Sequence, residues 1–174
     1  MERYTLGILV NNHPGVLSRV VGLFSRRGYN IDSLSVGETE DPAISRITIV
    51  VTGDRQIVEQ IEKQVAKLID VAKVVELTMQ GSIQYELVLV KLSTVNGNRA
   101  AVIQLSEIFK AKIVDVTEDT ITLMLTGNLD KISSFLRLSR QYGICELVRT
   151  GITAIERGSQ AEARSDLDDD QYNA

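Results

Sequence analysis

The chain has 174 residues, of which 44% are hydrophobic and 24% charged, a composition typical of a globular protein. Its 23 acidic and 19 basic residues give a formal net charge of −4, which argues against nucleic acid as a partner. No apolar run approaches the ~18 residues that a membrane-spanning helix needs. A strand pattern begins at Tyr4, so we expect no targeting peptide, and the single Cys145 fits a reducing compartment.

The first half of the chain alternates between patterns of period two and patterns of helical spacing. Gly28 is placed to end the first helix, and Asp54 is a suitable N-cap for the second. The patterns predict, in order, a strand over 4–10, a loop over 11–15, a helix from 16 toward Gly28, a strand over 30–37, a turn over 38–42, a strand over 47–53, a helix over 55–69 and a strand over 71–79. This is the order βαββαβ.

The second half repeats this order. Asn98 can cap its first helix and Gly143 can end its second. The patterns predict a strand over 85–92, a helix over 99–109, strands over 113–116 and 121–125, a helix over 129–142 and one long strand over 144–155. We therefore predict an α+β protein of two tandem ferredoxin-like βαββαβ domains, residues 1–79 and 80–157, followed by a disordered acidic tail at 158–174.

A βαββαβ domain places both helices on one face of its sheet and leaves the other face bare. Four apolar strand residues break the alternation, namely Leu9, Val50, Val88 and Val90, and we expect them to make the bare face partly apolar. This predicts that a second domain or subunit covers the face, and it favours a homodimer over a monomer.

Candidates for catalysis or metal binding are few. His13 and Cys145 form a nucleophilic pair only if folding joins the two halves, and His13 has no neighbour at a metal-ligand spacing. The run Asp168–Asp170 could hold a hard cation but is more often a solvated charge run. We therefore expect no catalytic residue, no metal and no cofactor in this chain.

The loop between the first strand and the first helix is the most informative segment. A helix N-terminus has unpaired N–H groups that can hold a carboxylate, and Gly15 would let a ligand approach the backbone. Asn12 and Asn30 each offer an acceptor and donors to the charged ends of an amino acid. Val16, Leu17 and Ile31 could receive its apolar side chain. In the alternative interpretation Asn12 only caps the helix, Pro14 starts it and Asn30 sits in a turn.

Longer runs of the sequence resemble a known family. They are 12–24 (NHPGVLSRVVGLF), 26–34 (RRGYNIDSL), 39–42 (TEDP), 45–51 (SRITIVV), 60–64 (QIEKQ), 67–71 (KLIDV), 86–91 (ELVLVK), 113–116 (IVDV) and 151–152 (GI). Over about residues 2–157 the chain is similar to the small regulatory subunit of acetohydroxyacid (acetolactate) synthase, with an N-terminal ACT domain and a C-terminal ACT-like domain.

The resemblance implies a non-catalytic regulatory subunit of branched-chain amino acid biosynthesis. ACT domains of two copies would pair into one sheet, and valine or another branched-chain amino acid would bind at their junction and cause feedback inhibition. One copy would contribute Asn12, Gly15, Val16 and Leu17, and the other Asn30 and Ile31. The C-terminal domain would contact and activate a large catalytic subunit, which would hold thiamine diphosphate, Mg2+ and FAD. Location would be the cytoplasm, or the plastid stroma if the chain is encoded there.

Two other classes remain open at this stage. An ACT-containing transcriptional regulator would need a basic recognition element, for which only Arg19, Arg26 and Arg27 on the first helix are available. A self-contained enzyme on the same fold is the third possibility. The sequence leaves undetermined which branched-chain amino acid is preferred, whether the chain is effector-sensitive, the stoichiometry with the large subunit, bacterial or plastid origin, and the residues that contact the large subunit.

Overall fold

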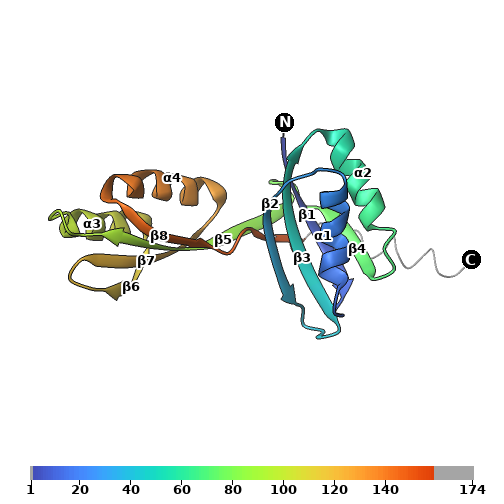
Figure 1. Cartoon of the computed structure of the whole chain (residues 1–174), viewed down its shortest axis with the longest axis horizontal. Coiled ribbons are helices and arrows are strands. Elements are labelled where there is room, and N and C mark those ends of the chain that lie inside the picture. The colour runs from blue at the N-terminus through green and yellow to red at the C-terminus, as the bar shows by residue number, and fades with distance from the viewer. Residues whose placement is uncertain (1, 159–174) are drawn as a thin grey trace, which may run out of the picture. The chain divides into compact units, whose positions relative to one another are not determined.

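The computed structural model of the chain describes residues 2–158 and divides into two compact units. The first unit consists of residues 2–84 together with 152–158, and the second of residues 85–151 (Figure 1). Each is a βαββαβ arrangement, so the predicted fold class is confirmed.

The first unit is a four-stranded antiparallel sheet with two helices on one face (Figure 1). Its elements are β1 (Glu2–Asn11), α1 (Val16–Arg26), β2 (Ile31–Glu38), β3 (Ile44–Gly53), α2 (Arg55–Val65) and β4 (Val71–Glu76). The strand order β2-β3-β1-β4 makes β2 and β4 the outer strands. Alternate residues of β1 and β3 pack with α1 and α2 in a buried core that includes Leu6, Ile8, Val20, Phe24, Ile47, Ile49, Val58 and Ile61.

Local residue chemistry accounts for the ends of the helices. Gly15 precedes α1 with φ +86°, and Gly28 follows it with φ +72°, and both values lie in the left-handed region that glycine tolerates. The N-cap Asp54 of α2 has extended backbone but makes no side-chain cap. Helix α2 ends at Val65 rather than at the predicted residue 69, because Val65 is its last buried residue and Ile69 is 95% exposed.

The second unit repeats the arrangement. Its elements are β5 (Ser82–Ser93), α3 (Arg99–Phe109), β6 (Lys112–Val116), β7 (Thr120–Gly127), α4 (Leu129–Ser139), the short 3-10 helix η1 (Arg140–Tyr142) and β8 (Ile144–Arg149). The strand order is β6-β7-β5-β8. The core includes Val88, Val90, Leu92, Ile121, Leu123, Ile132 and Phe135. Val88 and Val90 thus face the helices, and the prediction that they lie on the bare face was wrong, because the side chains of β5 alternate about them.

The predicted long strand over 144–155 is in fact two strands. Strand β8 ends at Arg149, Gly151 has φ +80°, and a separate strand β9 (Thr153–Glu156) follows. Strand β9 pairs with β5, and Arg157 N–H donates to Gly81 O at 3.0 Å. The left-handed glycine redirects the chain into the first unit, so the unit boundaries differ from the predicted 1–79 and 80–157.

Part of the helix-free face of the first sheet is covered by this returning segment. Ile152 and Ala154, 4% and 2% exposed, form a buried cluster with Val50, Val75 and Leu77. Val50 lies on this face as predicted, but its cover is a segment of the same unit and not a second domain or subunit. The predicted tail lies, except for Gly158, outside the described residues. No helix within residues 2–158 is long and apolar enough to cross a membrane.

Candidate functional site

Asn12 follows β1 and is hydrogen-bonded to the turn between β2 and β3. Its backbone N–H donates to Ala43 O at 2.7 Å, and its side-chain Nδ2 donates to Glu38 Oε1 at 3.1 Å and to Pro42 O at 3.0 Å. It does not cap α1, whose N-cap is Gly15. The carbonyl oxygen Oδ1 of Asn12 makes no hydrogen bond within the described residues, so it can accept one from a ligand.

The start of α1 exposes backbone donors. Val16 N–H donates weakly to His13 O at 3.3 Å, and Arg19 N–H donates to Gly15 O at 3.1 Å. Within residues 2–158 the N–H groups of Gly15, Leu17 and Ser18 have no acceptor. A Cβ placed on Gly15 would meet nothing within 4 Å, so the glycine is required by its positive φ and leaves open space above it. A carboxylate can approach these donors.

Of the two apolar residues predicted to contact a ligand here, Val16 is buried in the core and Leu17 is exposed. Val16 is 2% exposed and belongs to the core, so its side chain cannot receive a ligand, contrary to the prediction. The reason is its place on the first turn of α1, on the stripe that continues with Val20 and Phe24. Leu17 is 39% exposed and can contact a ligand.

Asn30 and Ile31 lie where β2 begins. Asn30 is exposed, and its Nδ2 donates to Asp32 Oδ1 at 2.9 Å, so its Oδ1 stays available within the described residues. Ile31 is partly buried against the core and pairs with Val51 of β3. Asn30 therefore supplies one acceptor group beside an apolar surface.

The two predicted halves of the site lie at opposite ends of one strand. Asn12 is hydrogen-bonded to Glu38, the last residue of β2, whereas Asn30 precedes Ile31, the first. Seven residue steps of strand separate these ends by about 23 Å. One copy of the chain cannot close Asn12 and Asn30 on one amino acid. Strand β2 is an outer strand of its sheet, so its outer edge carries unpaired backbone groups.

One of the basic residues on α1 is neutralised by an acidic residue. Arg19, one of three arginines considered for nucleic-acid recognition, is paired with Asp70 at 2.7 Å. Within the part of the chain that the structure describes, no group of three or more His, Cys, Asp or Glu side chains gathers in a way that could hold a metal ion.

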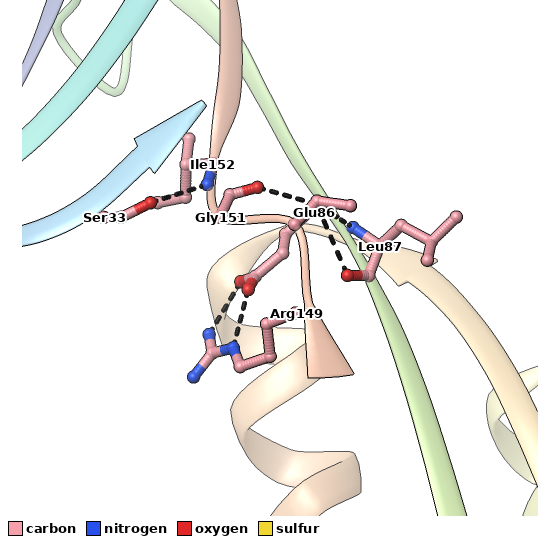
Figure 2. A network of polar contacts seen from close by, with 7 residues as sticks. Ser33, Glu86, Leu87, Arg149, Gly151 and Ile152 are labelled. Carbon is pink, nitrogen blue, oxygen red and sulfur yellow. Dashed lines mark hydrogen bonds and ion pairs between the residues drawn. The ribbon is translucent and has the colours of Figure 1, made fainter. Parts of the chain in front are cut away.

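Strand β2 also holds the segment that returns from the second unit. Ile152 N–H donates to Ser33 Oγ at 2.9 Å (Figure 2). Ser35 Oγ donates to Ile152 O at 3.0 Å. Before the return, Thr150 N–H donates to Leu87 O at 3.1 Å, and Arg149 holds Glu86 through Nε and Nη2 at 2.6 and 2.7 Å (Figure 2).

Sequence reasoning missed the roles of Glu38 and Pro42 in holding Asn12. The turn over 38–42 was predicted, but its pairing with the end of β1 depends on the register of three strands. Ser33 and Ser35 were also missed, because their partner lies 117 to 119 positions away in the sequence.

Comparison with known proteins gives concordant matches over both units. Residues 6–73 match the sequence profile described as "AHAS small subunit-like ACT domain", and residues 85–158 match "Small subunit of acetolactate synthase". The probable acetolactate synthase small subunit of Archaeoglobus fulgidus is 49% identical over 158 residues, covering 91% of this chain and 99% of that one. The acetolactate synthase small subunit of Haemophilus influenzae is 46% identical over 159 residues, covering 91% and 98%.

A solved structure agrees with these sequence matches. The crystal structure of the acetolactate synthase small subunit from Thermotoga maritima superposes with a TM-score of 0.84 at 39% sequence identity. The match covers 91% of this chain and 99% of that one.

Proposed function

Because the chain belongs to the family of acetolactate synthase small subunits, we propose that it senses a branched-chain amino acid and controls a catalytic large subunit. The proposed effector, valine in the first instance, binds between two copies of the first unit. The chain itself performs no catalytic step, and thiamine diphosphate, Mg2+ and FAD belong to the large subunit.

The positions of Asn12 and Asn30 carry this proposal. Two copies whose outer β2 edges pair antiparallel about a two-fold axis place the Ile31 end of one strand beside the Glu38 end of the other. Since Asn12 is held at the Glu38 end, Asn30 of the second copy meets it there. The same contact covers the unpaired edge of β2, which is exposed in a single copy.

The chemistry of the groups fits an amino acid zwitterion. The N–H groups of Gly15, Leu17 and Ser18 and the helix dipole of α1 favour a carboxylate. The free oxygens of Asn12 and of Asn30 from the second copy accept hydrogen bonds from the ammonium group. Leu17 of one copy and Ile31 of the other offer apolar contact to a branched side chain.

A contiguous set of hydrogen bonds supports coupling between this site and the rest of the chain. Strand β2 borders the proposed site. Its Ser33 accepts a hydrogen bond from Ile152 N–H (Figure 2), and its Ser35 donates one to Ile152 O. A ligand that favours one arrangement of two β2 strands therefore acts on the segment that leads to Thr150 and β8. Couplings between sites in proteins are typically worth ~1–3 kcal/mol.

Calorimetric titration of the purified full chain with L-valine tests the proposed site. We expect saturable binding, and we expect Asn30→Ala to weaken it roughly tenfold or more, since a hydrogen bond to a charged group contributes ~1.5–3 kcal/mol. Asn96→Ala is the control, because Asn96 is an exposed asparagine of the second unit, in the loop between β5 and α3 that corresponds to the loop of Asn12. Equal affinity in wild type and Asn30→Ala would refute the site.

A further inference from the structure

Arg46 is a cation on the helix-free face of the first sheet whose charge is not neutralised. It lies on β3, where it pairs with Leu9 of β1 on one side and Gly37 of β2 on the other. Its Nε and Nη2 are buried and have no hydrogen-bond partner, and no acidic residue among positions 2–158 forms an ion pair with it. Burying such donors without an acceptor is unfavourable.

The unsatisfied atoms are those with which arginine grips a carboxylate. Nε and Nη2 form one planar edge of the guanidinium, and its two parallel N–H groups match the two oxygens of a carboxylate. Arg149 shows this use in the second unit, where its Nε and Nη2 donate to the two oxygens of Glu86 at 2.6 and 2.7 Å. Arg46 has the same edge without an acceptor.

Gly7 and Gly37 flank Arg46 on the neighbouring strands, and because neither has a Cβ, the Arg46 side chain has space on both sides. It now folds inward, with Nη2 only 3.1 Å from the position that a Cβ of Gly7 would occupy. Gly37 is its direct neighbour on the outer side, and a Cβ there would have nothing within 4 Å. The guanidinium can therefore turn from the space over Gly7 to the space over Gly37.

The space over Gly37 is a cavity of about 220 Å3. Its lining residues include Arg46, Ser35, Thr48 and Thr153. The Ser35 hydroxyl already donates to Ile152 O at 3.0 Å. Glu38 borders the cavity, but its Oε1 accepts from Asn12 and it does not pair with Arg46. Strand alternation directs Glu38 to the face opposite that of Gly37.

We propose that this cavity binds a carboxylate, held by the Nε and Nη2 edge of Arg46 after the side chain turns from Gly7 toward Gly37. The site differs from the proposed effector site in its binding groups, because Arg46 lies on the helix-free face and α1 on the other, and the two sites adjoin at Glu38. Its carboxylate comes either from a small organic acid or from an aspartate or glutamate of the catalytic large subunit. These two sources share one chemistry and differ in the experiment that reveals them.

The first arm of the test is a titration of the 15N-labelled full chain with sodium acetate at constant ionic strength, followed by NMR. Saturable shifts are expected at the Arg46 Nε–H and at the Gly37 and Thr48 amides. Arg46→Gln should weaken binding roughly tenfold to a hundredfold, the range for a lost charge-assisted hydrogen bond. Arg3→Gln is the control, since it removes the same charge from an exposed position on the same sheet.

The second arm measures the affinity of the full chain for the catalytic large subunit. A loss with Arg46→Gln but not with Arg3→Gln, without an acetate effect, identifies an acidic side chain of the large subunit as the ligand. Acetate shifts that depend on Arg46 identify a small acid. Gly37→Val, which fills the outer space without changing the charge, should weaken the same interaction.

The proposal is overturned if Arg46→Gln and Gly37→Val both behave as wild type in the two arms. Arg46→Lys tests whether the Nε and Nη2 edge is needed, because lysine keeps the charge but cannot make the bidentate contact. Compared with Arg46→Gln, it should restore carboxylate binding only in part. Valine titrations of these variants separate the two sites, since the effector affinity should be unchanged by Arg46→Gln.

Discussion

Arg149 neutralises the buried charge of Glu86 in the second unit. The side chain of Glu86 is 2% exposed, and the two hydrogen bonds from Arg149 neutralise it in place. The hydrogen bonds to Glu86 also raise the pKa of the Arg149 guanidinium. Removing the cation therefore leaves an anion buried with no partner, which is more costly than losing an exposed pair.

We predict that Arg149→Ala lowers the free energy of unfolding of the protein by about 3 kcal/mol. Chemical denaturation followed by circular dichroism measures the change. Lys91→Ala is the control, because Lys91 and Glu146 form an ion pair with side chains 37% and 62% exposed, and little change is expected there. Equal effects of the two substitutions would contradict the account of Glu86.

At the scale of elements, the two sheets differ in what lies on their helix-free faces. In the first unit, Ala154 of β9 and Ile152, which directly precedes β9, cover Val50, Val75 and Leu77. In the second unit Leu89 and Val148 pair across β5 and β8 and are 36% and 53% exposed. Since the chain belongs to the family of acetolactate synthase small subunits, we propose that the large subunit docks on this face of the second unit.

We predict that Val148→Glu weakens association with the large subunit roughly tenfold, the effect of losing one well-buried interface contact. Sedimentation of the mixed subunits measures the association. Val116→Glu is the matched control, since Val116 is also an exposed β-branched residue of the second sheet, 52% exposed, but pairs with the core residue Ile121 and so lies on the opposite face. If Val116→Glu has the larger effect, the docking surface has been assigned to the wrong face.

At the scale of the whole molecule, the proposed effector site exists only when two copies meet. Asn12 and Asn30 lie at opposite ends of β2, so each site of a symmetric dimer takes Asn12 from one copy and Asn30 from the other. A dimer of one Asn12→Ala chain with one Asn30→Ala chain has one intact site and one site that lacks both asparagines.

We therefore predict complementation. Each variant alone binds L-valine weakly, and a mixture that has been unfolded and refolded together regains wild-type affinity at part of its sites. Calorimetry of the mixture against each separate variant measures this. Failure to regain any tight site, with mixed dimers demonstrated by mass spectrometry, would refute the site shared between two copies.

The order of elements could be predicted because each depends on neighbours in the sequence. Alternation from Tyr4 to Val10 and helical spacing after Gly15 correspond to β1 and α1, and Gly28 and Gly143 both have the positive φ expected of helix ends. The caps were less predictable. Asn98 makes no cap and its Oδ1 is buried without a partner, whereas Asn128, which was not predicted, accepts from Lys131 N–H at 3.0 Å.

The residues of the candidate site could be listed from the sequence, but their roles depended on packing. Val16 and Leu17 are adjacent apolar residues that sequence alone treats alike, and the helix turns one into the core and the other to solvent. Arg46 was not distinguished at all. Its proposed role depends on two glycines on neighbouring strands, and the register that brings them together is not visible in any local pattern.

The sequence by itself determined the family, the two βαββαβ units and the segments that contain Asn12 and Asn30, because these follow from short-range patterns and from extended runs of family residues. The tertiary structure alone decided that Gly151 returns the chain to the first sheet and that the two asparagines lie at opposite ends of β2. Both are consequences of strand pairing between residues far apart in the chain, where burial and backbone hydrogen bonding outweigh local preference.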